Sequence, residues 1–412
     1  MNTRQLADLN FKDSWLKDPA HQAFLMNDAR KQYTFFDKSL RGDGGFDVLD
    51  INGTALPRAG QELHTTTRLI HSYSLGVATG HPNSARMVDA GMKYLWNMHR
   101  DKQHGGFFWS VDATNILDDL KLAYGHVFVL LAASSAKLAG HPDADRILAD
   151  VADILDRYYW DDQVGLYRDE FARDWQPFST YRGMNSNMHA VEAMLVAFEA
   201  TGETFWLDRT ARILDFFTNQ IAPKHDWRLP EHFHQDWRVN PDFFGNPIFR
   251  PAGCTPGHSF ELSRLLLQYW DLSGRTDPTA FTRASHLVMQ AFNDAWLPDG
   301  GLAYTTRLDG SIDIASRFWW PVTEAIGVFS ALQKLDKAQD FESLYRRTWT
   351  FANSQLIDHE NGGWFPELDI SGQPVSQQFL GKPDLYHSLQ AVLFPLVPSL
   401  SRHYQALKKL VI

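Results

Sequence analysis

Six large polar or aromatic side chains recur along the sequence at nearly equal intervals, 58 to 69 residues apart. They are Arg68, His126, His189, His258, Trp320 and His387. Imidazole has an unperturbed pKa of about 6.5 and is suited to moving protons at carbon next to a carbonyl. A guanidinium beside such histidines can hold the enediolate oxygen that forms between two proton transfers. This set favours proton transfer alpha to a carbonyl over glycoside hydrolysis, which normally uses two carboxylates.

The spacing of these residues follows a repeat that runs through the whole chain. Short glycine-centred turns with aromatic neighbours mark it at Gly44, Gly105, Gly165, Gly300 and Gly362, and Glu231 marks a glycine-free unit at the same phase. The markers lie 60 to 69 residues apart, so six units fill the chain. No linker or charge block divides them, and we expect one domain over residues 1–412.

Between the markers the sequence predicts pairs of helices. Residues 124–139 are apolar on nearly all sides, which is typical of an enclosed helix, whereas 85–100 and 205–221 are amphipathic. Six such pairs close most simply into a double ring, an all-α (α/α)6 barrel with short β-hairpin or loop segments at one mouth. A solenoid with atypical capping units is the alternative. In a closed ring the six recurring side chains would meet at that mouth.

Two of the expected inner helices begin with recognisable capping residues. Thr255 precedes Pro256 and places His258 in a first helical turn, and Asp384 does the same for His387. The partial positive charge of a helix N-terminus disfavours imidazolium, so these rings should stay neutral, as a base requires. Glu261 lies three residues after His258, on the same helix face, and could orient its ring.

Other residues have alternative interpretations. Trp320 could pack in the core or stack on a sugar face, and Glu192 and Glu324 could be acids or structural acceptors. The segment 224–253 is long and aromatic and suits a lid or rim. Its Glu231-His232-Phe233-His234 cluster is only weak evidence for a metal site.

The composition excludes several classes of protein. The net charge of −10 disfavours a nucleic-acid partner, and the lone Cys254 excludes a disulfide framework. No apolar run approaches the length of a membrane span, and the polar N-terminal segment lacks the apolar stretch of a secretory signal. We therefore expect a soluble, cytoplasmic protein, monomeric or homodimeric.

Taken together, several motifs resemble the N-acylglucosamine 2-epimerase superfamily, within it the aldose–ketose isomerase branch. They are Arg68, Tyr124-Gly125-His126-Val127-Phe128, Asn185-Ser186-Asn187-Met188-His189-Ala190-Val191-Glu192-Ala193, Glu231-His232-Phe233, Gly253-Cys254-Thr255-Pro256-Gly257-His258-x-x-Glu261, Trp320-Pro321-Val322-Thr323-Glu324-Ala325 and Asp384-Leu385-Tyr386-His387. The resemblance extends from about residue 60 to about residue 396.

This resemblance implies an (α/α)6 barrel and a metal-free, cofactor-free proton transfer through a cis-enediolate. It implies that His387 moves the proton between C2 and C1, and that His258, supported by Glu261, opens the sugar ring. His189 and Arg68 would bind hydroxyls and steady the intermediate. The expected substrate contacts are Asn185, Trp320, Tyr124, His126 and Glu324.

Within this branch we expect a free monosaccharide substrate, D-mannose interconverted with D-fructose, with D-lyxose as a secondary substrate. Sulfosugar isomerases carry glutamines where this chain has Pro366 and Pro383, which makes a sulfonated sugar the weaker alternative. A 2-epimerase of the mannose or cellobiose type is another alternative, although the segment before His258 would crowd a second sugar unit. An inverting glycoside hydrolase using two of Glu192, Glu261 and Glu324, and a non-catalytic sugar-binding barrel, remain as rivals.

Overall fold

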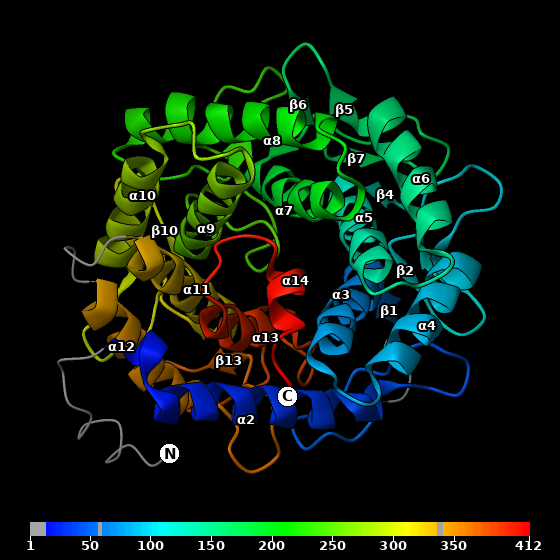
Figure 1. The fold of residues 1–412 in the computed structure, drawn as a ribbon. Helices are drawn as coiled ribbons and strands as arrows, with labels where there is room; N and C mark the ends of the chain where they lie inside the picture. The colour runs from blue at the N-terminus through cyan, green and yellow to red at the C-terminus, as the bar shows by residue number, and fades with distance from the viewer. Residues whose placement is uncertain (1–13, 57–59, 336–340) are drawn as a thin grey trace.

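The computed structural model describes residues 14–56, 60–335 and 341–412. Two concentric rings of helices surround a common axis (Figure 1). The inner ring consists of α3 (Leu63–Thr79), α5 (Ala123–Leu138), α7 (Met184–Thr201), α9 (Pro256–Leu272), α11 (Trp319–Leu335) and α13 (Tyr386–Leu393). Each inner helix contacts the next in chain order, and α13 contacts α3. The predicted (α/α)6 barrel is therefore confirmed.

The outer ring takes its sixth helix from the N-terminal part of the chain. α4 (Ser84–Tyr94), α6 (Ala144–Ile154), α8 (Phe205–Asp215), α10 (Ala280–Ala295) and α12 (Phe341–Phe351) each pack on the preceding inner helix, whereas α2 (Pro19–Phe36) packs on α13. Proline at the first position of α2 and the Asp18 carboxylate, which accepts from the Ala20 amide, fix its start. The last pair of the barrel thus joins the two ends of the described chain.

The predicted helices lie where the hydrophobic patterns place them, with a difference at the outer helices. The enclosed segment 124–139 is α5, buried on nearly all sides. The amphipathic segments end in wide π-helical turns: η3 (Leu95–His99) follows α4 and η5 (Phe216–Ile221) follows α8. Similar turns, η4 (Leu155–Tyr159) and η7 (Ala352–Leu356), follow α6 and α12. The wide turn thus recurs in four of the six units and is absent after α10 and α2.

The glycine markers occupy backbone conformations that favour glycine. Their φ angles are 89° at Gly44, 79° at Gly105, 82° at Gly165, 97° at Gly300 and 88° at Gly362. In the glycine-free unit, Asp226 and Trp227 have the positive φ angles, 53° and 63°. The turn of that unit therefore lies a few residues before the predicted marker, Glu231.

A belt of two-residue strands holds the N-terminal ends of the inner helices. The strand before an inner helix pairs with a strand of the next repeat: β1 (Gln61–Glu62) with β2 (Ser110–Val111), β4 (Lys121–Leu122) with β7 (Glu170–Phe171), β8 (Arg182–Gly183) with β9 (His232–Phe233), and β12 (Arg317–Phe318) with β13 (Glu367–Leu368). The bridges Cys254–Thr306 and Lys382–Leu49 complete the circle. All six inner helices thus begin at the same end of the barrel.

The remaining strands and short helices connect these elements. They are β3 (Ile116–Asp118), β5 (Trp160–Asp161), β6 (Leu166–Tyr167), β10 (Thr305–Thr306), β11 (Ile312–Ile314), η1 (Trp15–Lys17), η2 (Asp37–Ser39), η6 (Ala222–His225), η8 (Phe394–Leu396) and α14 (His403–Leu407). No helix among the described residues is both long and apolar enough to cross a bilayer.

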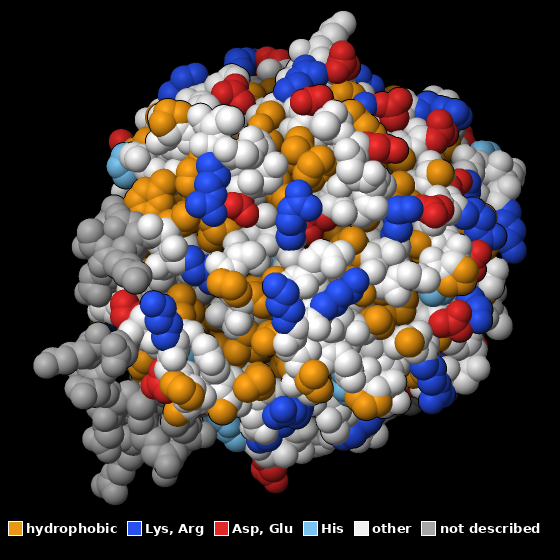
Figure 2. Space-filling model, viewed as in Figure 1, with side chains coloured by type: hydrophobic (Ala, Val, Ile, Leu, Met, Phe, Trp, Pro, Cys, Tyr) orange, Lys and Arg blue, Asp and Glu red, His pale blue; other side chains and the backbone are white. Residues whose placement is uncertain are grey.

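The C-terminal segment covers the other end of the inner ring. The amide of Ile412 donates to the Thr79 carbonyl at the end of α3 (3.0 Å), and the amide of Arg402 donates to Glu199 of α7 (2.8 Å). Ser401 Oγ donates to Asp271 at the end of α9 (2.6 Å). Figure 1 looks onto this end, with α14 over the centre, and Figure 2 shows side chains filling that centre. The first turns of the inner helices lie at the opposite end.

Candidate active site

Five of the six recurring side chains lie together at the belt end of the inner ring. The Trp320 ring contacts two histidines, with centroid distances of 5.1 Å to His258 and 5.8 Å to His387. Trp320 itself is partly exposed, whereas both histidines are buried. Three consecutive inner helices, α9, α11 and α13, therefore bring two imidazoles onto one indole.

Each of these histidines is paired through Nδ1 with a carboxylate. His387 Nδ1 lies 2.8 Å from Glu324 Oε1, and His258 Nδ1 lies 2.7 Å from Glu231 Oε1. Such a carboxylate fixes the ring orientation and places the proton on Nδ1. Within the described part of the chain neither Nε2 has a hydrogen-bond partner, so both remain available to a ligand.

The carboxylates differ from the predicted assignments. Glu261, expected to orient the His258 ring, does not contact it; that position is taken by Glu231, which precedes β9. Glu324, expected to contact substrate, is the partner of His387 instead. The backbone explains the exchange, because the belt pairing of β8 with β9 carries Glu231 to the start of α9, where Cys254 bridges to Pro230.

Arg68 lies close enough to His387 for its charge to act on that ring, and it is held by aromatic rings and a carboxylate. Its Nη2 donates to Tyr124 Oη at 2.8 Å, and its Nη1 donates to Asp384 Oδ2 at 3.4 Å. Its guanidinium carbon lies 4.6 Å from the Phe128 ring centroid and 4.8 Å from that of Tyr386. Burial disfavours the charge, but the neighbouring Tyr124 and Asp384 raise the Arg68 pKa above its usual value. The site thus contains a fixed cation.

His189 joins the same cluster from α7. Its ring lies 4.7 Å from the Phe128 ring and 5.2 Å from that of Tyr124, measured between centroids. Burial lowers its pKa to about 3, so the ring is neutral at neutral pH. One turn earlier, Asn185 is partly buried, and its side-chain oxygen has no partner among the described residues. Both residues are therefore placed to offer neutral polar contacts.

A buried ionic cluster supports the site from deeper in the barrel. Arg264 Nε donates to Glu324 Oε2 at 3.1 Å, and Arg264 Nη2 lies 4.0 Å from Glu192 and 3.9 Å from Glu261. Glu192 also accepts a hydrogen bond from the hydroxyl of Tyr386. Arg264 and Tyr386 are not among the predicted site residues, since neither shares the phase of the recurring residues.

Two carboxylates of this cluster have pKa values shifted in opposite directions. Burial opposes ionisation of Glu324, but the Arg264 charge and the hydrogen bond with His387 lower its pKa. Burial, together with the charges of Glu324 and Glu192, raises the Glu261 pKa well above its usual value. Neither oxygen of Glu261 has a hydrogen-bond partner among the described residues, and the side chain is wholly buried. We therefore assign Glu261 as the neutral acid of the cluster.

His126 shares the phase of the other recurring residues but not their direction. Its Nε2 accepts from the Phe107 amide at 3.0 Å, and its Nδ1 lies 2.7 Å from the Leu122 carbonyl and 3.1 Å from Tyr159 Oη. The ring is wholly buried against the turn at Gly106. Both ring nitrogens of His126 are thus occupied by protein groups. His126 stabilises the fold, and the predicted contact with substrate is not supported.

Two groups of buried side chains bring ligand atoms close enough for a metal ion. One consists of His189, Glu192 and Glu261, the other of Glu261, Glu324 and His387, with atoms within 4.8 Å of one another. In the second group, Glu324 and His387 are already hydrogen-bonded to each other.

In the segment 224–253, both ring nitrogens of His232 lie at hydrogen-bond distance from protein groups, Tyr181 Oη and the Pro251 carbonyl. The predicted rim segment is thus tied to the belt by His232.

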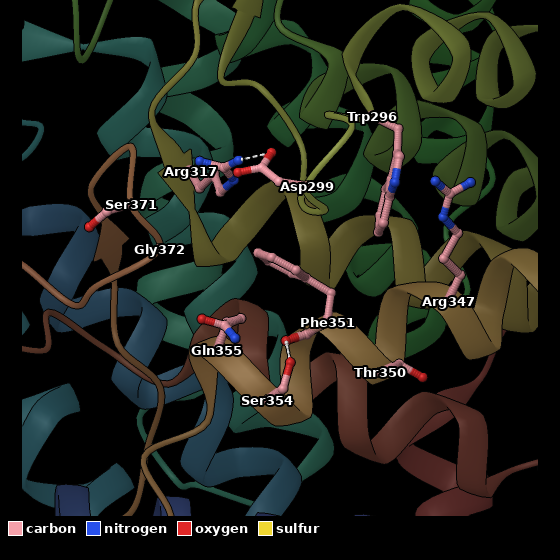
Figure 3. Close-up of a pocket in the computed structure, with 10 residues that line it drawn as sticks. All are labelled: Trp296, Asp299, Arg317, Arg347, Thr350, Phe351, Ser354, Gln355, Ser371 and Gly372. Atoms are coloured by element: carbon pink, nitrogen blue, oxygen red, sulfur yellow. Dashed lines mark hydrogen bonds and ion pairs between the residues drawn. The ribbon is translucent and has the colours of Figure 1, made fainter. Parts of the chain in front are cut away.

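A separate groove of about 610 Å³ lies on the outside of the barrel, between α12 and two turns of the belt (Figure 3). There Arg317, the first residue of β12, pairs with Asp299 and donates from Nε to the Gly300 carbonyl at 2.8 Å. Trp296 is covered by Phe292 on one side and by the Arg347 guanidinium. No histidine is among the described residues that line the groove, and Arg317 anchors the strand that leads into α11.

Residues 44–391 match the family model of N-acylglucosamine 2-epimerase. The chain is 37% identical over 394 residues to a D-mannose isomerase of Thermobifida fusca, covering 93% of this chain and 96% of that protein. It is 36% identical over 394 residues to a D-mannose isomerase of Pseudomonas cannabina pv. alisalensis, covering 93% and 95%. A crystal structure of a D-mannose isomerase superposes with a TM-score of 0.86 at 29% identity, over 92% of this chain and 99% of that one. Sequence and fold agree, and the chain belongs to the N-acylglucosamine 2-epimerase family.

Proposed function

We propose that the protein is a sugar isomerase that interconverts D-mannose and D-fructose, and also D-lyxose and D-xylulose, without a metal ion. The relatives named D-mannose isomerase, similar over nearly the whole chain, support this activity. The observation that carries the proposal is the arrangement of His258 and His387 on Trp320. Each ring is hydrogen-bonded to a carboxylate through Nδ1, and its Nε2 has no partner among the described residues. The charge of Arg68 acts on His387.

The reaction begins with opening of the sugar ring. We assign this step to His258, whose Nε2 takes the proton of the C1 hydroxyl as the C1–O5 bond breaks, and then protonates O5. The aldehyde form results, with no net change in protons. Glu231 stabilises the transient imidazolium through Nδ1–H, because a carboxylate hydrogen bond favours the charged ring.

Isomerisation of the open chain then needs one base at carbon. His387 Nε2 removes the proton from C2, and the electrons move through C2 and C1 onto O1, forming a cis-enediolate. Arg68 balances the charge on the enediolate oxygens. The imidazolium of His387 returns its proton to C1 while the proton of O2 passes to O1, which leaves the ketone at C2. Burial lowers the pKa of His387 below its usual 6.5, so the ring is neutral and able to act as a base at neutral pH.

The carboxylates argue against a glycoside hydrolase. An inverting or retaining mechanism needs two carboxyl groups across the scissile bond. In this structure Glu324 is engaged by His387 and Arg264, and Glu192 by Tyr386. Glu261 is wholly buried. None of these three carboxyl groups is therefore free to act as an acid or a base at a glycosidic bond.

Product analysis tests the proposal directly. Purified protein is incubated with D-mannose in a buffer containing EDTA, and the products are followed by NMR. D-Fructose as the main product supports the proposal, and D-glucose as the main product would reassign the protein as a 2-epimerase. Unchanged mannose would leave a hydrolase or a non-catalytic barrel, and loss of activity in EDTA that Mn²⁺ restores would assign a metal to the buried clusters.

A further inference from the structure

A histidine of α3, His64, lies four residues before Arg68 and so on the same helix face, one turn closer to the belt end. Its ring stacks on Trp109, with centroids 5.1 Å apart and planes inclined by 12°. Its centroid lies 5.9 Å from that of Tyr124, the residue whose hydroxyl binds Arg68. His64 therefore adjoins the candidate site, although no step of the mechanism uses it.

The fold builds the stacked pair of His64 and Trp109 with specific contacts. The Leu63 amide donates to the Trp109 carbonyl at 2.8 Å, which fixes the two residues side by side. The Trp109 indole lies over Gly125, where an added Cβ would come within 3.4 Å of the indole and 2.8 Å of the Leu63 side chain. A Cβ at Gly125 would therefore crowd the Leu63 side chain, next to His64, and would only touch the indole.

The polar atoms of His64 lack protein partners. Its Nδ1 is buried and, among the described residues, makes no hydrogen bond, because Glu62 Oε2 lies 3.4 Å away without suitable geometry. No bond to Nε2 is found in the described part of the chain, and the side chain is 12% exposed. Burial and the nearby charge of Arg68 lower the His64 pKa well below its usual value. The residue is thus a neutral imidazole whose Nε2 is the nitrogen left for a ligand, as donor or acceptor according to the tautomer.

We propose that His64, stacked on Trp109, is a specificity-determining contact for the hydroxymethyl end of a hexose. The inference rests on the proposed function, which places C1 and C2 between His258 and His387 and their oxygens near Arg68. One helical turn, about 5.4 Å, separates Arg68 from His64 along α3, which is comparable to the reach of the remaining sugar chain. The imidazole would bond to the C6 hydroxyl, while the indole edge would cover the C–H groups beside it.

The test compares D-mannose with D-lyxose, which has the same configuration at C2 to C4 but no C6. In His64→Ala, kcat/KM for mannose should fall about tenfold, the value of one hydrogen bond of about 1.4 kcal/mol. For lyxose it should change by less than about twofold, since that sugar has no group at the position. His64→Asn, which keeps a donor and an acceptor, should recover part of the mannose activity.

The matched control is His286→Ala, because His286 is an exposed histidine that packs on Trp227 in the outer ring. This variant should have the wild-type kcat/KM for both sugars and the wild-type melting temperature. Equal losses for both sugars in the two His64 variants, or no loss for either sugar, would overturn the inference. Failure of the wild-type protein to isomerise either sugar would instead refute the proposed function itself.

Discussion

Replacement of Glu324 by glutamine tests the histidine–carboxylate pair at the centre of the mechanism. In the native site Oε1 faces His387 Nδ1 at 2.8 Å and Oε2 accepts from Arg264 Nε at 3.1 Å. Glutamine has one acceptor oxygen and one donor group, so it can satisfy only one of these neighbours. Either the His387 ring loses its proton acceptor, or an amide donor faces the Arg264 guanidinium.

A hydrogen bond to a charged group contributes about 1.5–3 kcal/mol, which corresponds to a loss of about 10- to 150-fold in kcat/KM. The pH dependence changes in a defined direction. The base must be neutral, so activity falls on the acid side, below pH 6.5, because burial lowers the pKa of His387. Glu324 raises that pKa, and its removal should move the acid limb to still lower pH while the plateau falls.

The assay measures kcat/KM for mannose across pH, together with the melting temperature. Glu203→Gln, at an exposed position, is the control and should match the wild-type protein. A Glu324→Gln variant with a plateau within twofold of wild type, or an acid limb that moves to higher pH, would refute the reasoning.

Three further predictions concern Arg68, Glu231 and two glycines. Arg68→Lys should lower kcat/KM more than it lowers stability, because a point charge cannot reproduce the planar fork, and an unchanged rate would remove Arg68 from the mechanism. Glu231→Gln should lower kcat/KM about tenfold or more, because the His258 ring loses the carboxylate 2.7 Å from its Nδ1. Activity equal to that of the wild-type protein would show that this contact has no part in the reaction. Gly253→Ala should lower the free energy of unfolding clearly more than Gly202→Ala does. The added Cβ would lie 2.3 Å from a backbone carbonyl oxygen at Gly253, whereas at Gly202 it would meet nothing within 4 Å. Equal losses in the two variants would contradict this.

Much of the fold follows from the periodicity of the sequence. The spacing of the glycine turns and the contrast between apolar and amphipathic helices predict six helix pairs, because each pair must bury its own apolar surface. The origin of the last outer helix does not follow, because α2 and its inner partner α13 lie at opposite ends of the chain. Its contact with α13 joins residues more than 350 positions apart and depends on closure of the ring.

The sequence predicts how far along the barrel axis each site residue lies, but not the direction in which its side chain points. Repeat phase places a side chain along the barrel axis, but each residue advances about 100° around its helix. His126 and His189 share the phase, and yet His126 faces the turn at Gly106 while His189 faces Tyr124. The partner of His258 could not be found from helical spacing, because Glu231 lies 27 residues earlier, in the segment before β9 and outside helix α9.

The fate of the C2 hydrogen tests the central claim, that His387 moves a proton between C2 and C1. D-Mannose is incubated in D₂O with the wild-type protein and with His387→Ala, and deuterium is located by NMR. We expect wild-type protein to place solvent deuterium at C1 of D-fructose and at C2 of recovered mannose, and His387→Ala to abolish both. Fructose formed without any solvent deuterium, or exchange at more than a tenth of the wild-type rate in His387→Ala, would contradict the account.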